Sequence, residues 1–207
     1  MTVTNIIVGL TVLISMGAFN NRELFAKLLH SPYIEHREKD YYRFISSGFI
    51  HADWMHLGIN MFVLYQFGNA VELWYKAGFG QQTGGLLYLA MYLGAVILGD
   101  IPSFYKYKND PSYRAIGASG GVSGVMLAFV VFEPWNILRL YGIVPIPAII
   151  GAILYLAYSS WAAKQNRGNI GHDAHFYGAV FGFLFTILIK PEFLQHFLIS
   201  LKDGMPF

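Results

Sequence analysis

The chain contains no cysteine among its 207 residues, which excludes disulfide bonds, thiolate nucleophiles and cysteine-based zinc sites. Charge is also scarce: only 13% of the residues are Asp, Glu, Lys or Arg, whereas an ordinary soluble domain has roughly 25%. With 55% hydrophobic residues and a mean hydropathy of +0.44, the composition predicts an integral membrane protein. The net charge of +2 is small, and we expect no nucleic-acid partner.

Internal repeats and low-complexity tracts are also missing, which disfavours a transporter built from repeats. The first apolar run has neither a basic n-region nor a clear small-residue cleavage site. We therefore expect it to be retained as a span and not removed as a signal peptide.

Six apolar stretches are about long enough to cross a bilayer. Because backbone polar groups in lipid must be hydrogen-bonded internally, each stretch is expected to be a helix. The predicted fold is all-α, a single domain of six transmembrane helices over residues 1–207. The expected spans are 2–19, 54–75, 84–101, 116–132, 143–163 and 174–189.

The longest connection, residues 20–53, joins the first two spans. Asn20 and Glu23 have the spacing of a capping box, and the residues that follow predict a short amphipathic helix at the membrane interface. Elsewhere the connections are short, and Pro102 and Pro191 are expected to stop helices at the ends of the third and sixth spans.

A glycine-rich stretch, residues 114–124, places one hydroxyl, that of Ser119, at the start of the fourth span. A serine at a helix N-terminus with uncovered N–H groups is one way to build an acyl-transfer site. The same stretch is also typical of a small-residue seam between helices, and Gly178 and Gly182 in the sixth span would complete such a seam. Taken alone, the stretch leaves both interpretations open.

The depths of four polar residues favour the catalytic interpretation. The second, fourth and sixth spans run in the same direction. At 1.5 Å per residue, Ser119 and His175 each lie about 20 Å from the far ends of their spans, and so at one depth. His56 and Asn60 are four residues apart on one helix face near the same surface. Because buried ionisable residues are costly, this convergence indicates a nucleophile, a base and side-chain donors.

These residues resemble those of the rhomboid family of intramembrane serine proteases, and the resemblance covers essentially the whole chain. The matching motifs are Gly117-Ala118-Ser119-Gly120, Ala174-His175 with Gly178, the series His51, His56 and Asn60, the pair Tyr42-Arg43, and Gly68 with Glu72.

The resemblance implies that Ser119 is the nucleophile and His175 the general base of a dyad without an acid. It implies an oxyanion site made by His56, Asn60 and the backbone N–H of Ser119. The implied supporting residues are His51, Gly117, Ala118, Gly120 and Gly178. Substrates would be the transmembrane segments of single-span proteins in membrane lipid, and neither a cofactor nor a metal is implied.

The chain departs from the family at one position of the site. Many rhomboids carry an aromatic residue four positions after the nucleophile, packed on the base, and here that position is Ser123. Ser123 is also a rival nucleophile, although Ser119 lies one turn nearer the helix end, where N–H groups are uncapped. Phe176 or Tyr177 is the expected substitute support for His175.

The membrane orientation is in conflict with the resemblance. The family's usual topology puts the N-terminus inside and opens the site to the outer side, with a bacterial inner membrane as the expected location. Of the 14 Lys and Arg residues, that topology puts only four inside: Lys76, Arg139, Lys190 and Lys202. The positive-inside rule therefore favours the opposite insertion.

Three other functions compete with that of a serine protease. A metalloprotease needs His-Glu-x-x-His or a comparable ligand set, and His51, His56, His172 and His175 do not have that spacing. An aspartyl protease needs two buried aspartates, and Asp100 has no convincing partner. A catalytically inactive relative that binds transmembrane helices is the serious alternative, but such proteins usually lack the serine or the histidine.

Overall fold

The computed structural model describes residues 1–140, 143–165 and 171–204. A long helix lies over each predicted span. These helices are α1 (Val3–Phe19), α5 (Trp54–Phe79), α6 (Gln81–Tyr107), α7 (Ser119–Phe132), α8 (Ala148–Gln165) and α9 (His172–Ile189).

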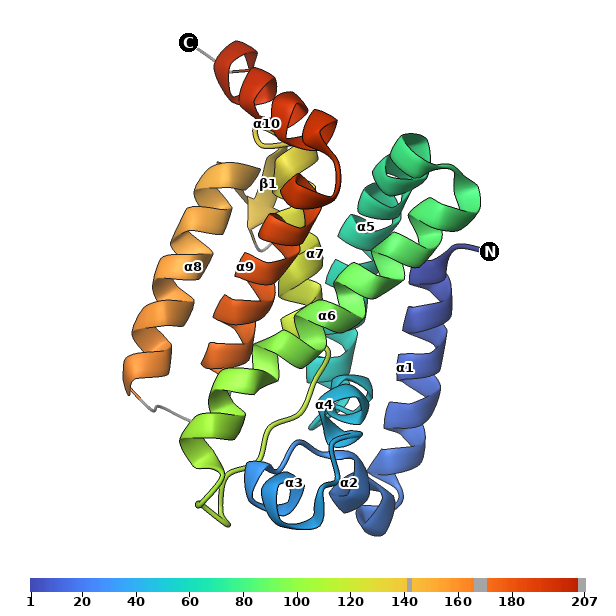
Figure 1. Ribbon diagram of the computed structural model, residues 1–207, viewed down its shortest axis with the longest axis vertical. Coiled ribbons are helices and arrows are strands. Elements are labelled where there is room, and N and C mark those ends of the chain that lie inside the picture. The colour runs from blue at the N-terminus through green and yellow to red at the C-terminus, as the bar shows by residue number, and fades with distance from the viewer. Residues whose placement is uncertain (141–142, 166–170, 205–207) are drawn as a thin grey trace.

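The six long helices form one bundle with α7 at its centre (Figure 1). Helix α7 contacts α5, α6, α8 and α9, whereas α1 packs on α5 at one edge and α8 packs on α9 at the other. Almost every residue of α7 is buried. The start of this helix, where Ser119 lies, is therefore surrounded by other elements.

Fewer than six of the described helices meet the length and hydropathy expected of a membrane span, whereas the sequence predicted six spans. Among the described residues, only α6, with 27 residues, is by itself both long and apolar enough to span a membrane. Helix α9 passes the same test only together with α10 (Pro191–Asp203), from which it is bent by 110°. Helices α1 and α7 are apolar but shorter. The number of membrane crossings therefore stays a prediction.

Glycines bring α7 and α9 into backbone contact. A Cβ atom on Gly178 would collide with the backbone of Gly120, and one on Gly182 would collide with the backbone of Gly124. The predicted small-residue seam between the fourth and sixth spans is confirmed by these contacts. Because backbone meets backbone along the seam, the separation of the two helices does not depend on side-chain packing.

The first long connection contains three short helices and a 3₁₀ turn at one end of the bundle (Figure 1). These elements are α2 (Arg22–Leu28), α3 (Pro32–Glu38), α4 (Arg43–Ser46) and η1 (Ser47–Phe49). The predicted capping box is displaced by one residue, because Asn21 caps α2 through a 3.0 Å bond from the Leu24 N–H. Arg43 is buried and donates to the carbonyls of Ala26 and Leu29 at 2.8 and 3.1 Å, which ties the connection together.

Prolines account for the other differences from the predicted helices. The fifth span was predicted to begin at residue 143, but Val144–Pro147 forms strand β2, which pairs antiparallel with β1 (Ile137–Leu140). Pro145 and Pro147 cannot donate within a helix, so α8 begins only after them.

Pro102 does not end α6, which continues to Tyr107. A proline removes a single helical hydrogen bond, and here the helix tolerates that loss. Pro191 opens α10 at its first turn, where its missing N–H costs nothing.

Candidate active site

A cavity of about 950 Å³ lies at the N-terminal end of α7. Ser119, His175, His56 and Asn60, the four residues predicted to carry the chemistry, all line it. They come from three different helices, α7, α9 and α5. The structure therefore brings together the residues that the depth argument placed at one level.

Ser119 is the first residue of α7, and the turn before it is held on both sides. The Gly117 N–H donates to the Ser47 carbonyl at 2.9 Å, and His30 and Ala115 exchange two backbone hydrogen bonds of 3.0 Å each. Gly117 has φ +113°, and a Cβ atom there would lie 2.8 Å from Cε1 of His56. Only glycine allows both this backbone conformation and this approach of the imidazole.

His51 supports the same turn through a hydrogen bond to its backbone. Its Nε2 accepts a 3.3 Å hydrogen bond from the Ala118 N–H, and its Nδ1 lies 3.0 Å from Ser15 Oγ. Ser15 donates its own proton to the Phe49 carbonyl, so Nδ1 of His51 must be the donor to Ser15. The imidazole is therefore neutral. Burial lowers the pKa of His51 to about 3, and the neighbouring His56 acts in the same direction.

The candidate oxyanion donors lie on the first turns of α5. Asp53 caps this helix by accepting from the His56 N–H at 2.8 Å. The ring of His56 packs edge-on against that of His51, with 4.9 Å between centroids. Asn60 donates one amide hydrogen to the His56 carbonyl at 2.9 Å. An Asn amide carries two hydrogens, so this bond orients the group and uses only one of them.

His175 reaches the cavity from the first turn of α9. Its ring stacks with that of Tyr155 on α8, with centroids 6.2 Å apart and planes 22° from parallel. Phe176 and Tyr177, the expected supports, pack edge to face on each other. The sequence did not reveal the role of Tyr155. Its contact with His175 depends on how α8 and α9 are rotated relative to each other, and the residue spacing within one helix does not predict that rotation.

Ser123 lies one turn below Ser119 and is engaged in two hydrogen bonds. Its Oγ donates to the Ser119 carbonyl at 2.6 Å and lies 2.5 Å from the hydroxyl of Tyr155. The position that carries an aromatic residue in many rhomboids thus holds a small hydroxyl that contacts an aromatic residue of another helix.

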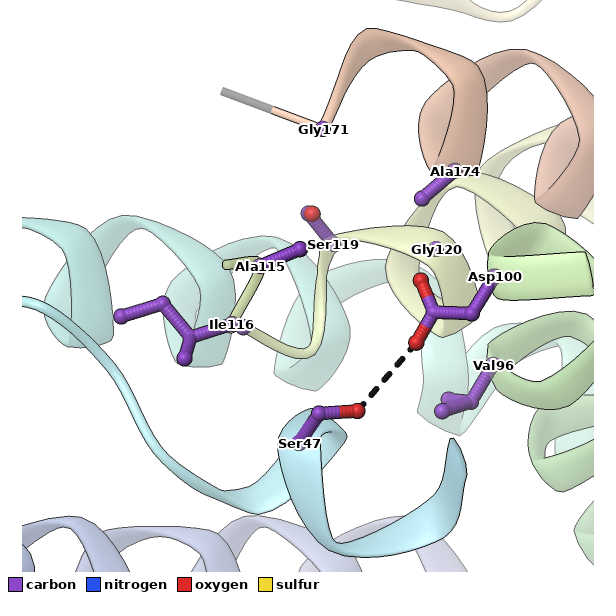
Figure 2. Close-up of a pocket in the computed structure, with 10 residues that line it drawn as sticks. Ser47, Val96, Asp100, Ala115, Ile116, Ser119, Gly120, Gly171 and Ala174 are labelled. Atoms are coloured by element: carbon purple, nitrogen blue, oxygen red, sulfur yellow. Dashed lines mark hydrogen bonds between the residues drawn. The ribbon is translucent and has the colours of Figure 1, made fainter. Parts of the chain in front are cut away.

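A second, much smaller cavity of about 10 Å³ is lined in part by Ser119. Figure 2 shows the residues around it. Asp100 and Ser47 face it, and Ser47 Oγ donates to the Asp100 carboxylate at 3.2 Å. This volume is roughly what one water molecule needs. Asp100, for which the sequence showed no partner, is therefore hydrogen-bonded to Ser47, whose carbonyl holds the turn before Ser119.

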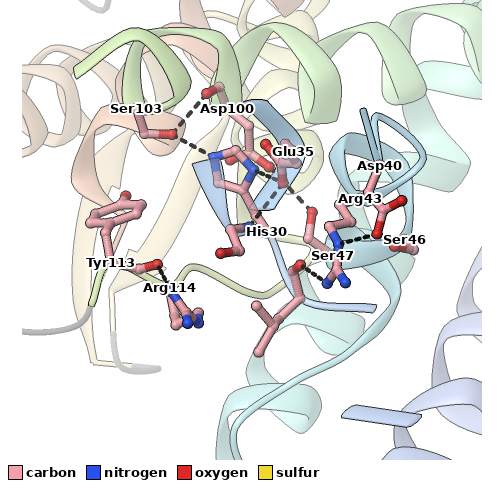
Figure 3. Close-up of polar contacts among 12 residues, drawn as sticks. His30, Glu35, Asp40, Arg43, Ser46, Ser47, Asp100, Ser103, Tyr113 and Arg114 are labelled. Carbon is pink, nitrogen blue, oxygen red and sulfur yellow. Dashed lines mark hydrogen bonds and ion pairs between the residues drawn. The ribbon is translucent and has the colours of Figure 1, made fainter. Parts of the chain in front are cut away.

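Beyond that small cavity lies a buried polar cluster that the sequence did not reveal (Figure 3). His30 Nδ1 lies 2.7 Å from the Glu35 carboxylate, and its Nε2 lies 2.9 Å from Ser103 Oγ. Ser103 donates its proton to the Asp100 carbonyl, so His30 must donate from both nitrogens and is protonated. Burial alone would lower the pKa of His30, but the carboxylates of Asp100 and Glu35 outweigh it and raise this pKa.

No group of three or more His, Asp or Glu residues is arranged to hold a metal ion in the part of the chain that the structure describes. The side chain of His172, one of the four histidines weighed as metal ligands, lies outside that part.

Comparison with known proteins identifies the family of this chain. The model of the rhomboid domain matches residues 38–192, about three quarters of the chain. The chain belongs to the rhomboid family. The match runs from the last residue of α3 through both α7 and α9, and so includes Ser119, His175, His56 and Asn60.

Curated rhomboid relatives are similar over most of the chain. RHOMBOID-like protein 12, mitochondrial, of Arabidopsis thaliana is 32% identical over 65% of this chain. Rhomboid-like protein 11, chloroplastic, of the same plant is 24% identical over 86%. Rhomboid protein 1, mitochondrial, of Saccharomyces cerevisiae is 28% identical over 68%. The chain spans 42%, 64% and 40% of the lengths of these three proteins.

Rhomboids are integral membrane proteins, in agreement with the composition of this chain. The names of the three relatives place them in mitochondria and a chloroplast. They therefore give no support to the expectation of a bacterial inner membrane.

Proposed function

We propose that this rhomboid is an intramembrane serine endopeptidase that cuts the transmembrane segments of single-span membrane proteins. The observation that carries the proposal is the shared cavity. A serine at a helix N-terminus, a histidine and two side-chain donors from three helices all line it. This is the set of groups that acyl transfer requires: a nucleophile, a general base and an oxyanion site.

In the proposed reaction, His175 takes the proton of Ser119 as the hydroxyl oxygen attacks the peptide carbonyl. Negative charge develops on the carbonyl oxygen, where Asn60, His56 and the Ser119 N–H act as donors. The intermediate then collapses: the peptide C–N bond breaks and His175 gives its proton to the leaving amine. Water hydrolyses the resulting ester by the same base, releasing the new carboxylate and regenerating Ser119.

Supporting contacts favour Ser119 over Ser123 as the nucleophile. Ser119 begins α7, so the first N–H groups of the helix are not used by preceding carbonyls. Ser123 lies one turn into the helix and gives its proton to the Ser119 carbonyl. The proposed dyad needs no acid, since His175 takes up a proton only while the charged intermediate is present.

The decisive experiment uses the purified protein in liposomes with a fluorogenic single-span substrate. The native chain should cleave it, and Ser119→Ala should abolish cleavage. Ser123→Ala should still cleave at a measurable rate, because it retains the nucleophile.

Two results would contradict the proposal. Equal rates in the native chain and in Ser119→Ala would exclude Ser119 as the nucleophile. If neither chain cleaves, a fluorophosphonate label separates the remaining cases. Labelling that requires Ser119 would show an active enzyme given the wrong substrate, and failure to label would indicate a relative that binds helices without cutting them.

A further inference from the structure

Helix α8 turns a face of small residues toward the bundle, with one large side chain in the middle. The buried residues of this face follow the helical repeat and are Ala148, Ala152, Ser159 and Ala162. Tyr155 occupies the central position of the same series and is half-buried at the cavity. Small residues let α8 lie close to its neighbours, so a lone tyrosine there extends into the space between α8, α9 and α7.

Both ends of the Tyr155 side chain contact the candidate active site. The face of its ring stacks on the imidazole of His175, at 6.2 Å between centroids and 22° between planes. Its hydroxyl lies 2.5 Å from Ser123 Oγ. Since Ser123 donates to the Ser119 carbonyl at 2.6 Å, Ser123 must accept the proton of Tyr155. One side chain therefore links the backbone of the candidate nucleophile to the ring of the candidate base.

We propose that Tyr155 is a positioning residue that holds the imidazole of His175 for proton transfer, and that Ser123 anchors the ring of Tyr155. The inference rests on the proposed function, because it assigns a support to the base of that reaction. Ser123 stands where many rhomboids carry the aromatic residue that packs on the base. In this chain the aromatic ring comes from Tyr155 on α8, and Ser123, at the usual position, accepts a hydrogen bond from its hydroxyl.

The physical reason is that a base works only when its nitrogen is aligned with the hydroxyl. An imidazole turns easily about its last side-chain bond, for which the torsional preference is broad. A ring stacked on one face limits that rotation. The π face also attracts the positive charge that His175 carries after it takes the proton of Ser119. The hydrogen bond to Ser123 stops the tyrosine ring from tilting away.

The test compares variants that remove the ring with variants that remove only its anchor. Tyr155→Leu removes the ring, and Tyr155→Phe keeps the ring but loses the hydroxyl. Ser123→Ala removes the other half of the hydrogen bond. Tyr158→Leu is the matched control, because it makes the same change on the same helix at a residue that is 56% exposed.

Two quantities are measured for each variant in liposomes. The first is the rate constant for labelling of Ser119 by a fluorophosphonate, which reports the reactivity of the dyad without any need for substrate. The second is the separate kcat and KM for cleavage of the single-span substrate. Melting temperatures of all variants are recorded in detergent.

We expect Tyr155→Leu to lower both the labelling rate and kcat by about 10²-fold, with little change in KM, as for a small misplacement of a reacting group. Tyr155→Phe should recover most of this loss and remain about 3- to 10-fold below the native chain, the usual effect of one hydrogen bond. Tyr158→Leu should match the native chain.

A double-mutant cycle tests the anchor. Tyr155→Phe and Ser123→Ala break the same hydrogen bond, so the double variant should lose no more activity than the more damaging single variant. This cycle keeps the ring in place and so does not depend on Tyr155→Leu folding well.

Four results would overturn the inference: native rates in Tyr155→Leu, a loss confined to KM, an equal loss in Tyr158→Leu, or losses that multiply in the double variant. Failure of the proposed function would look different, because the native chain would then show no cleavage and no labelling that depends on Ser119.

Discussion

His30 and His51 lie on either side of the same turn of the chain, but one imidazole is charged and the other is neutral. Both are fully buried. His30 contacts a carboxylate and donates from both nitrogens, so it is charged. His51 accepts from the Ala118 N–H and donates to Ser15, so it is neutral. Burial is the same in the two places, and the hydrogen-bonding partners alone decide the charge.

This difference in charge distinguishes the two sides of the turn that precedes Ser119. On one side lies the large cavity, which His56 and Asn60 line together with Ser119. On the far side, the ion pair of His30 and Glu35 is sealed within the fold and holds the connection against Ala115. We expect changes on the far side to alter mainly stability and changes on the cavity side to alter mainly turnover.

The largest expected effect is on stability and comes from the buried ion pair of His30 and Glu35. His30→Leu leaves the carboxylate of Glu35 buried without its cation, and should lower the free energy of unfolding by about 3–5 kcal/mol. Denaturant unfolding in detergent measures this change. The double variant with Glu35→Leu removes both charges and should recover part of the loss. A double variant as unstable as the single one would show that the charge pair is not the cause.

A somewhat smaller effect, on the activation free energy of turnover, is expected from the residues that line the large cavity. Asn60→Ala and His56→Ala should each lower kcat by about 10²- to 10³-fold, because each removes a donor to the developing oxyanion. Their unfolding should stay close to that of the native chain. Unchanged turnover in both variants would remove these residues from the site, and a loss of stability that matches the loss of turnover would erase the contrast between the two sides.

A third expected effect is on the pH dependence of stability. The pKa of His30 is raised above 6.5, so its contribution is fully present below that pH and disappears as the pH rises through the folded value. The pKa of His51 is lowered to about 3, so its contribution is present above pH 6.5 and disappears as the pH falls toward 3.

Melting temperature against pH tests this pair. The native chain should lose stability on both sides of a maximum, His30→Leu should flatten the alkaline side, and His51→Gln should flatten the acid side. The opposite assignment of slopes would show that the protonation states deduced from the hydrogen bonds are wrong.

The convergence of the four site residues could be predicted because it depends on regular geometry. A helix rises by the same amount at every residue, so distances counted from the ends of the spans placed Ser119, His175, His56 and Asn60 at one level. The cavity that all four line agrees with that prediction. The glycine seam was predictable for a similar reason, since small residues on two helices mark the place of close approach.

Other features depend on partners that are remote in the sequence. His30 is buried as a cation only because Glu35 and Ser103, from two different elements, close around it. Tyr155 gains its place from the rotation of α8 relative to α9, which no spacing within either helix determines. Strands β1 and β2 were not predicted, because residues 143–147 are as apolar as the helix that follows them. Two prolines in that stretch were the only sign in the sequence against a helix there.

The backbone contact between α7 and α9 has a consequence for a protein that lies within lipid. Membranes differ in thickness, and transmembrane helices can tilt to match that thickness. The glycines of the seam leave α7 and α9 nothing compressible between them. We therefore expect the spacing of Ser119 and His175 to change little with bilayer thickness, and sensitivity to lipid composition to arise from the helices at the edges of the bundle.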